Sequence, residues 1–209
     1  MKKLFVILFF SLAIVTYGQE QSVQLSAGVC FDAGYFFGST QTNSSQNIEY
    51  NFNNRRLGFN AFIGAEILTF ALIEAKIYNV WENSRSGDTD PQDIHRLGVT
   101  FSLMGQYPFY IDQNIRVSPL FGFELDLRLF YDSDSVESSW RGDHDILKNN
   151  DQVFLIFGGA IDYFLTNNIA FHSRLFYNVQ LYRRWVAEDT NSKQTNHGPR
   201  VMLGVKYVF

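Results

Sequence analysis

The chain has 209 residues, of which 46% are hydrophobic and 17% aromatic, and its formal net charge is −4. An acidic balance makes nucleic acid a poor partner, and a lone cysteine, Cys30, excludes an intramolecular disulfide framework. The length suits about one domain.

The N-terminus has the pattern of a secretory signal peptide. A basic start, Met1-Lys2-Lys3, precedes an apolar run from Leu4 to Val15, and Thr16-Tyr17-Gly18 supplies small residues before a cleavage point. The apolar run is shorter than the ~18 residues that a transmembrane helix needs. We therefore expect residues 1–18 to be a signal peptide and residues 19–209 to form the mature domain.

Eight segments of the mature chain alternate between apolar residues at odd positions and polar or small residues at even positions. A period of two predicts strands with two unlike faces. No second apolar run reaches the length of a membrane helix, so we expect an all-β protein. The expected strands cover residues 22–37, 55–67, 70–81, 94–106, 115–130, 152–165, 168–181 and 199–209.

Alternation fits two architectures. A soluble sandwich or lipocalin-like barrel has its apolar face inside, whereas a membrane barrel has its apolar face in lipid. The even face combines charges with most strand glycines and with aromatic residues such as Phe62 and Tyr78. Glycine weakens a water-facing strand, but on the inner wall of a narrow barrel it makes room for a large neighbour. Together with the signal peptide, this favours the membrane barrel.

The connections between the expected strands alternate in length. Leu68-Thr69, residues 107–114 and Thr166-Asn167 are short, whereas residues 38–54, 82–93, 131–151 and 182–198 are longer. This alternation is typical of short periplasmic turns and longer extracellular loops, and it predicts that both termini are periplasmic.

The last segment ends in Gly204-Val205-Lys206-Tyr207-Val208-Phe209. It resembles the final strand of bacterial outer-membrane barrels, which typically ends in Phe. The whole mature chain resembles the small eight-stranded barrels of the OmpA-transmembrane-domain and OmpX type, and it is similar to the PorT-like outer membrane protein beta-barrel families. The resemblance implies an eight-stranded antiparallel up-and-down transmembrane β-barrel of the Gram-negative outer membrane. It also implies that Val205, Tyr207 and Phe209 direct insertion by the barrel-assembly machinery.

The even face predicts a charged interior. An eight-stranded barrel is just wide enough for its side chains to fill it, and unpaired charge in that space is costly. We expect a salt-bridged, filled lumen, with a narrow solute path as the alternative. The expected lumen network is Glu66, Glu74, Lys76, Arg116, Glu124, Asp126, Arg128, Asp162, His172, Arg174 and Lys206.

A group of arginines falls at the expected extracellular strand ends. Guanidinium forks match phosphate geometry, and lipopolysaccharide carries phosphates at that depth. We hypothesise a rim that binds outer-membrane lipid and lipopolysaccharide phosphates. It consists of Arg55, Arg56, Arg96, Arg183, Arg184, Trp185 and Arg200.

No catalytic, cofactor or metal site is expected. A lipid A deacylase of the PagL type has a His and a Ser on one outer face, whereas His172 and Ser173 are adjacent and point to opposite faces. Asp88-Thr89-Asp90 resembles the start of a calcium loop but lacks its glycine and distal glutamate.

The sequence thus predicts a structural or interaction protein of the outer membrane with four extracellular loops. An accessory subunit of an outer-membrane secretion or assembly complex, of the PorT-like kind, is the alternative, with other outer-membrane proteins as partners. A narrow channel and a lipid A-modifying enzyme are less favoured.

Overall fold

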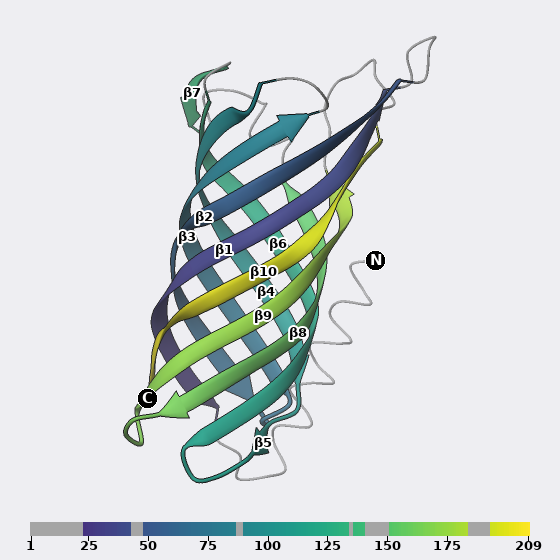
Figure 1. The fold of residues 1–209 in the computed structure, drawn as a ribbon. Coiled ribbons are helices and arrows are strands. Elements are labelled where there is room, and N and C mark those ends of the chain that lie inside the picture. Colours follow the sequence, from purple (N-terminus) through teal and green to yellow (C-terminus); the bar gives the residue numbers. More distant parts are fainter. Residues whose placement is uncertain (1–22, 43–47, 87–89, 134–135, 141–150, 184–192) are drawn as a thin grey trace, which may run out of the picture.

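The chain forms a tall, closed β-barrel (Figure 1). The computed structural model describes residues 23–42, 48–86, 90–133, 136–140, 151–183 and 193–209. Eight long strands form the wall: β1 (Gln24–Thr42), β2 (Ile48–Ile67), β3 (Ala71–Ser86), β4 (Gln92–Gln106), β6 (Ile115–Ser133), β8 (Gln152–Phe164), β9 (Ile169–Arg183) and β10 (Lys193–Val208). Two short strands, β5 (Phe109–Tyr110) and β7 (Val136–Trp140), pair with β6 at its two ends.

Each wall strand pairs antiparallel with the wall strand that follows it in the chain. The first and last strands, β1 and β10, also pair antiparallel, with Val29 opposite Val205, and this pairing closes the barrel. The predicted fold class, an eight-stranded antiparallel all-β barrel, is therefore confirmed. No helix among the described residues is long and apolar enough to cross a membrane.

The wall is inverted relative to a soluble protein. Outward residues such as Val29, Phe59 and Ile63 are 60–66% exposed, whereas inward residues such as Glu74 and Lys76 are at most 2% exposed. Burying charge and exposing apolar side chains would be unfavourable in water, so this arrangement suits a lipid surround.

The outward apolar band has the height of a membrane. On β1 it runs from Leu25 to Tyr35; the next outward residue, Phe37, is half-buried, and Ser39 beyond it is polar. That stretch rises about 33 Å along the strand, or about 25 Å along the barrel axis at a tilt near 45°. A height of about 25 Å matches the apolar band of outer-membrane barrels.

The two barrel ends differ. The connections from β2 to β3, from β4 to β6 and from β8 to β9 lie at one end, here called the turn end, where the C-terminus also lies (Figure 1). The opposite end is here called the loop end. At the turn end, Leu68 and Thr69 both have positive φ, at 57° and 62°, and they are the central residues of a β-turn that the Phe70 amide closes by donating to the Ile67 carbonyl at 3.2 Å.

The strands run further toward the loop end than predicted. Residues 38–42, 48–54, 82–86 and 193–198 were expected in loops but belong to β1, β2, β3 and β10. Beyond the apolar band the outer face is mostly polar. The sequence therefore loses its apolar alternation there, although hydrogen bonding between the strands continues. Residues 1–22, including the expected signal peptide, lie outside the described residues, as do 43–47, 87–89, 134–135, 141–150 and 184–192.

A bulge changes which way part of β6 faces. Gly98 pairs with Arg128 but Leu97 pairs with Phe130, so one extra residue, Leu129, lies in β6. Phe130 was expected inside because its number is even, but it contacts the outward rings of His95 and Trp140. The prediction was wrong because a bulge inverts the alternation.

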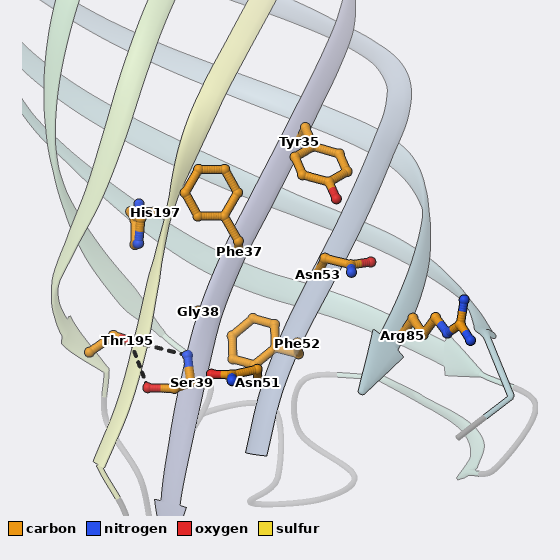
Figure 2. A pocket seen from close by; sticks show the side chains of 10 residues that line it. All are labelled: Tyr35, Phe37, Gly38, Ser39, Asn51, Phe52, Asn53, Arg85, Thr195 and His197. Carbon is orange, nitrogen blue, oxygen red and sulfur yellow. Dashed lines mark hydrogen bonds between the residues drawn. The ribbon is translucent and has the colours of Figure 1, made fainter. Parts of the chain in front are cut away.

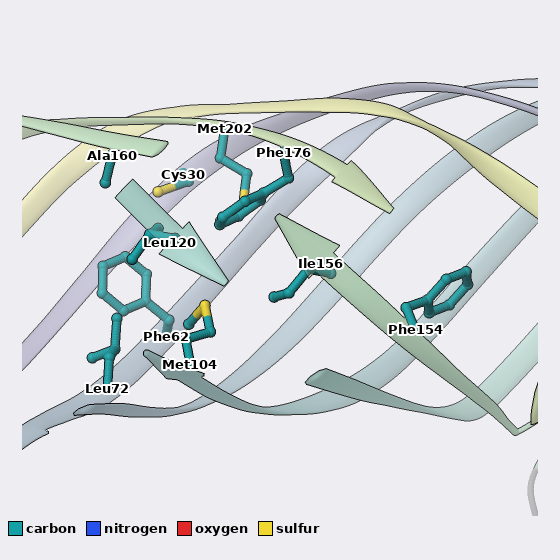
Figure 3. Packing of buried hydrophobic residues seen from close by; sticks show 10 residues of the cluster. All are labelled: Cys30, Phe62, Leu72, Met104, Leu120, Phe154, Ile156, Ala160, Phe176 and Met202. Atoms are coloured by element: carbon teal, nitrogen blue, oxygen red, sulfur yellow. The ribbon is translucent and has the colours of Figure 1, made fainter. Parts of the chain in front are cut away.

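An apolar cluster fills part of the interior between the charged residues (Figure 3). Phe62, Met104, Ile156, Phe176 and Met202 are each at most 3% exposed. The inner wall also carries glycines where neighbours approach closely. A Cβ at Gly98 would lie 2.3 Å from the Tyr78 hydroxyl oxygen, so glycine makes room for the tyrosine there.

Candidate functional site: a charged, closed interior

The centre of the barrel holds a chain of ion pairs that crosses the lumen. Arg200 on β10 binds Asp32 on β1 through Nε and Nη2, at 2.6–3.1 Å. Its Nη1 binds Glu124 on β6 at 2.8 Å, although two strands of the wall separate β10 from β6. Lys76 on β3 binds the other oxygen of Glu124 at 2.5 Å. Three strands on different sides of the lumen thus share one carboxylate.

A second pair extends this chain across the full barrel width. Arg174 on β9 binds both oxygens of Glu74 on β3, each at 2.6 Å. Lys76 Nζ lies 3.5 Å from Glu74 Oε1, so this pair joins the pair of Lys76 with Glu124. Bidentate charged contacts fix geometry as well as charge.

A separate cluster lies toward the turn end. Asp162 binds Arg116 at 2.8 Å and Lys206 at 2.5 Å, and its other oxygen contacts His172 Nδ1. Arg116 also binds Glu66 on β2 at 3.0 Å. A cavity of about 20 Å³ lies among these side chains, which is room for roughly one water molecule.

Interior side chains toward the loop end also form paired contacts. The Tyr78 hydroxyl donates to Asp126 at 2.7 Å, and the Arg56 guanidinium lies 4.8 Å from the centre of the Tyr78 ring. Arg96 binds Glu82 at 2.7 Å on the neighbouring strand.

Among the buried residues of the described barrel, carboxylates and Lys or Arg cations are equal in number; Arg96, which binds Glu82, is less buried and is not counted. The buried acids are Asp32, Glu66, Glu74, Glu82, Glu124, Asp126 and Asp162, and the buried Lys and Arg residues are Arg56, Lys76, Arg116, Arg128, Arg174, Arg200 and Lys206. Seven carboxylates facing seven cations remove the net charge that would otherwise be costly in a confined space. Because pairs join opposite walls, they also fill the cross-section through which a solute would pass.

All eleven residues expected in the lumen network are buried. The residues expected at the rim lie in different places. Arg55 is exposed, Arg96 binds Glu82, the side chain of Arg183 lies outside the description, and so do Arg184 and Trp185.

Arg56 and Arg200 must be removed from the rim. They are 8% and 2% exposed and face Asp32 inside the barrel. They had been placed at the rim because their strands were expected to end close to them. The strands in fact continue toward the loop end, so both arginines lie within the wall.

Several interior residues were not in the predicted network. Asp32 and Tyr78 occupy even positions of predicted strands, so the alternation could have included them. Glu82 was missed because its strand was expected to end one residue earlier.

The structure also places the other residues that the sequence analysis singled out. His172 is buried beside Asp162, whereas Ser173 lies on the outer face opposite Leu203 of β10. Val205, Tyr207 and Phe209 point outward and are 41–71% exposed. Within the described ranges, no group of three His, Cys, Asp or Glu side chains could hold a metal ion.

The fold resembles solved outer-membrane barrels. The chain superposes on the outer membrane protein OprG from Pseudomonas aeruginosa with a TM-score of 0.54 and 11% identity, over 90% of this chain and 97% of that one. Lower TM-scores relate it to AlkL, at 0.48 with 14% identity over 92% of each chain, and to Neisserial surface protein A, at 0.42 with 15% identity over 86% and 97%.

No protein-family model matches the chain, and no curated protein matches it. The superposition on OprG, together with the closed antiparallel wall, gives the chain the fold of a small eight-stranded outer-membrane β-barrel.

Proposed function

We propose that this chain is an integral protein of the bacterial outer membrane that has a closed lumen and acts in structure or interaction. In this proposal both termini and the turn end face the periplasm, and the loop end faces outside. Barrel-assembly machinery inserts the chain, and outer-membrane lipid, including lipopolysaccharide, surrounds it.

The observation that carries this proposal is the inversion of the wall. An apolar band of about 25 Å surrounds a neutral, salt-bridged interior, and water-exposed proteins do not have this arrangement. Exposed aromatic rings border the band, as interfacial belts do. At the turn end they are Tyr107, Phe109, Tyr110, Tyr163 and Tyr207, and at the loop end Tyr35, Trp81 and Trp140.

The closed lumen argues against transport through the barrel. Pairs from Asp32 through Arg200, Glu124 and Lys76 to Glu74 and Arg174 cross the described cross-section. Opening a path would require several buried charges to lose their partners together, and each such loss is strongly unfavourable.

Planar-bilayer recording tests the closed lumen. We expect no stepwise conductance from the purified barrel above the lipid baseline, with a general porin inserted in parallel as the positive control. Stable single-channel steps from the barrel would contradict the proposal.

Cross-linking of intact outer membranes tests the free-standing state. Migration as a single chain supports a structural barrel. Migration in a stable complex would replace it with the accessory-subunit function.

A further inference from the structure

A groove of about 720 Å³ lies on the outer face of the barrel, just beyond the apolar band at the loop end (Figure 2). Strands β10, β1, β2 and β3 contribute its lining. Tyr35 and Phe37 provide aromatic surface, and Asn51, Asn53 and Arg85 provide amide and guanidinium donors. The groove therefore combines flat rings with several hydrogen-bonding groups.

Contacts among the lining residues fix this groove. The ring of Phe37 packs edge-on against His197, with centroids 4.4 Å apart, and His197 Nδ1 lies 2.7 Å from the Tyr177 hydroxyl. The Ser39 amide donates to the Thr195 hydroxyl at 3.2 Å. Side chains held by their neighbours lose little entropy when they bind a ligand.

Two outward arginines are neighbours here: Arg85 on β3 lines the groove, and Arg55 on β2 lies just outside its lining. Arg55 pairs with Asn83 and Arg85 pairs with Asn53, so the two guanidiniums belong to diagonal neighbours on adjacent strands. Among the described residues neither forms an ion pair with a carboxylate. Two neighbouring cations repel one another, and a bound anion would remove that repulsion.

A second groove lies within the apolar band on the same strands, with Leu97 of β4 added to its lining. It measures about 640 Å³, and Phe31, Phe59, Ala61 and Leu203 are among its lining residues. The small side chain of Ala61 lies between larger apolar neighbours and leaves a hollow in the outer surface. A hollow of this kind fits an acyl chain better than a flat wall does.

The two grooves follow one another along β10, β1, β2 and β3. We propose that this face holds one phosphorylated glycolipid of the outer leaflet, with its sugar phosphate head in the upper groove and an acyl chain in the lower one. This inference rests on the proposed function, because it needs the loop end to face the outer leaflet.

The chemistry favours this lipid class over a simple phospholipid. A phospholipid phosphate would use the arginines but leave most of the groove's amides and hydroxyls to water. A sugar phosphate offers hydroxyls to Asn51, Asn53 and Thr195 and an anion to Arg55 and Arg85.

Native mass spectrometry of the full-length barrel in detergent tests the site, with purified lipid A and phosphatidylglycerol as competing probes. We expect the wild type to retain one lipid A in preference to phosphatidylglycerol. Joint Arg55→Gln and Arg85→Gln changes should reduce retention roughly tenfold or more, because charged hydrogen bonds are lost. Ala61→Trp, which fills the lower groove, should also reduce it.

A matched control lies on the opposite side of the wall. Leu125→Trp places the same ring on the outer face of β6, four strands away from β1, and should not alter lipid A retention. Glucosamine phosphate without acyl chains should bind far more weakly than lipid A. Equal retention of the two lipids, or equal loss in the Leu125→Trp control, would overturn the proposed site without affecting insertion or the closed lumen. Loss in the arginine variant but not in Ala61→Trp would overturn the acyl-chain part.

Discussion

Arg174 and Glu74 form a two-pronged ion pair across the full width of the barrel. They belong to β9 and β3, and three wall strands separate these strands in either direction around the barrel. Arg174 is 3% exposed and Glu74 is 1% exposed. The pair therefore connects two strands that share no backbone hydrogen bond.

Removing one partner should destabilise the barrel more than removing both. Arg174→Leu leaves Glu74 buried with only Lys76 nearby, and losing one member of a buried pair costs ~3–5 kcal/mol. The double change Arg174→Leu and Glu74→Leu should recover much of that loss. Urea unfolding in micelles, followed by gel mobility of the folded form, measures all three variants. Additive losses in the double variant would show that the pair is not coupled.

The sequence predicted the wall well because the wall follows a local rule. In a strand, side chains alternate between two faces. The even positions of Glu74, Lys76 and Arg174 therefore predicted that their side chains face the lumen. The pairing of Arg174 with Glu74, rather than with Glu124, depends on strand tilt and register between residues 100 positions apart. The alternation of side chains along one strand does not predict the tilt or the register between distant strands.

The errors have local causes as well. The bulge at Leu129 turns the side chain of Phe130 to the outer face. No residue type in that stretch predicts a bulge. Arg200 was placed at the rim because apolar alternation fades before the strand does. Apolar alternation therefore predicts where the apolar band of the membrane ends. It does not predict where the strand's backbone hydrogen bonding ends.

A side chain at Gly98 should disturb Tyr78. A Cβ there would lie 2.3 Å from the tyrosine hydroxyl and 2.4 Å from its ring, and that hydroxyl binds Asp126. Gly98→Ala should cost ~1–3 kcal/mol in unfolding free energy, as overpacking does. The cost should shrink in a Tyr78→Leu background, where the crowding ring is gone.

Gly105 on the same strand is the matched control. The nearest atom to a Cβ there is 3.7 Å away, so Gly105→Ala should leave stability unchanged or slightly raised. Equal losses for the two alanine variants would mean that crowding by Tyr78 is not the reason for glycine at position 98.

The hairpin turn at the turn end should accept a stabilising change. Leu68 and Thr69 have positive φ, a conformation that costs residues other than glycine about 1–2 kcal/mol each. Asn-Gly is the pair that a β-turn with positive φ at both central residues favours. Leu68→Asn with Thr69→Gly should raise the unfolding free energy by ~1 kcal/mol, measured by the urea midpoint. Leu68→Ala, which keeps the strain, should not, and a lower midpoint in the Asn-Gly variant would contradict the explanation.

The last strand should matter for assembly in the cell more than for folding alone. Tyr207 and Phe209 lie on the outer face with ring centres 5.0 Å apart, and the Phe209 amide donates to Leu25 at 2.9 Å. These two rings add outward apolar surface but pack against no interior residue. Tyr207→Ser with Phe209→Ser should therefore reduce folded barrel in cells severalfold, yet change spontaneous folding into thin phospholipid vesicles little. Tyr163→Ser, which removes an outward ring at the same end of the barrel, is the control and should leave both yields near wild type. Equal losses in cells and vesicles would assign the two rings to barrel stability instead of recognition by the assembly machinery.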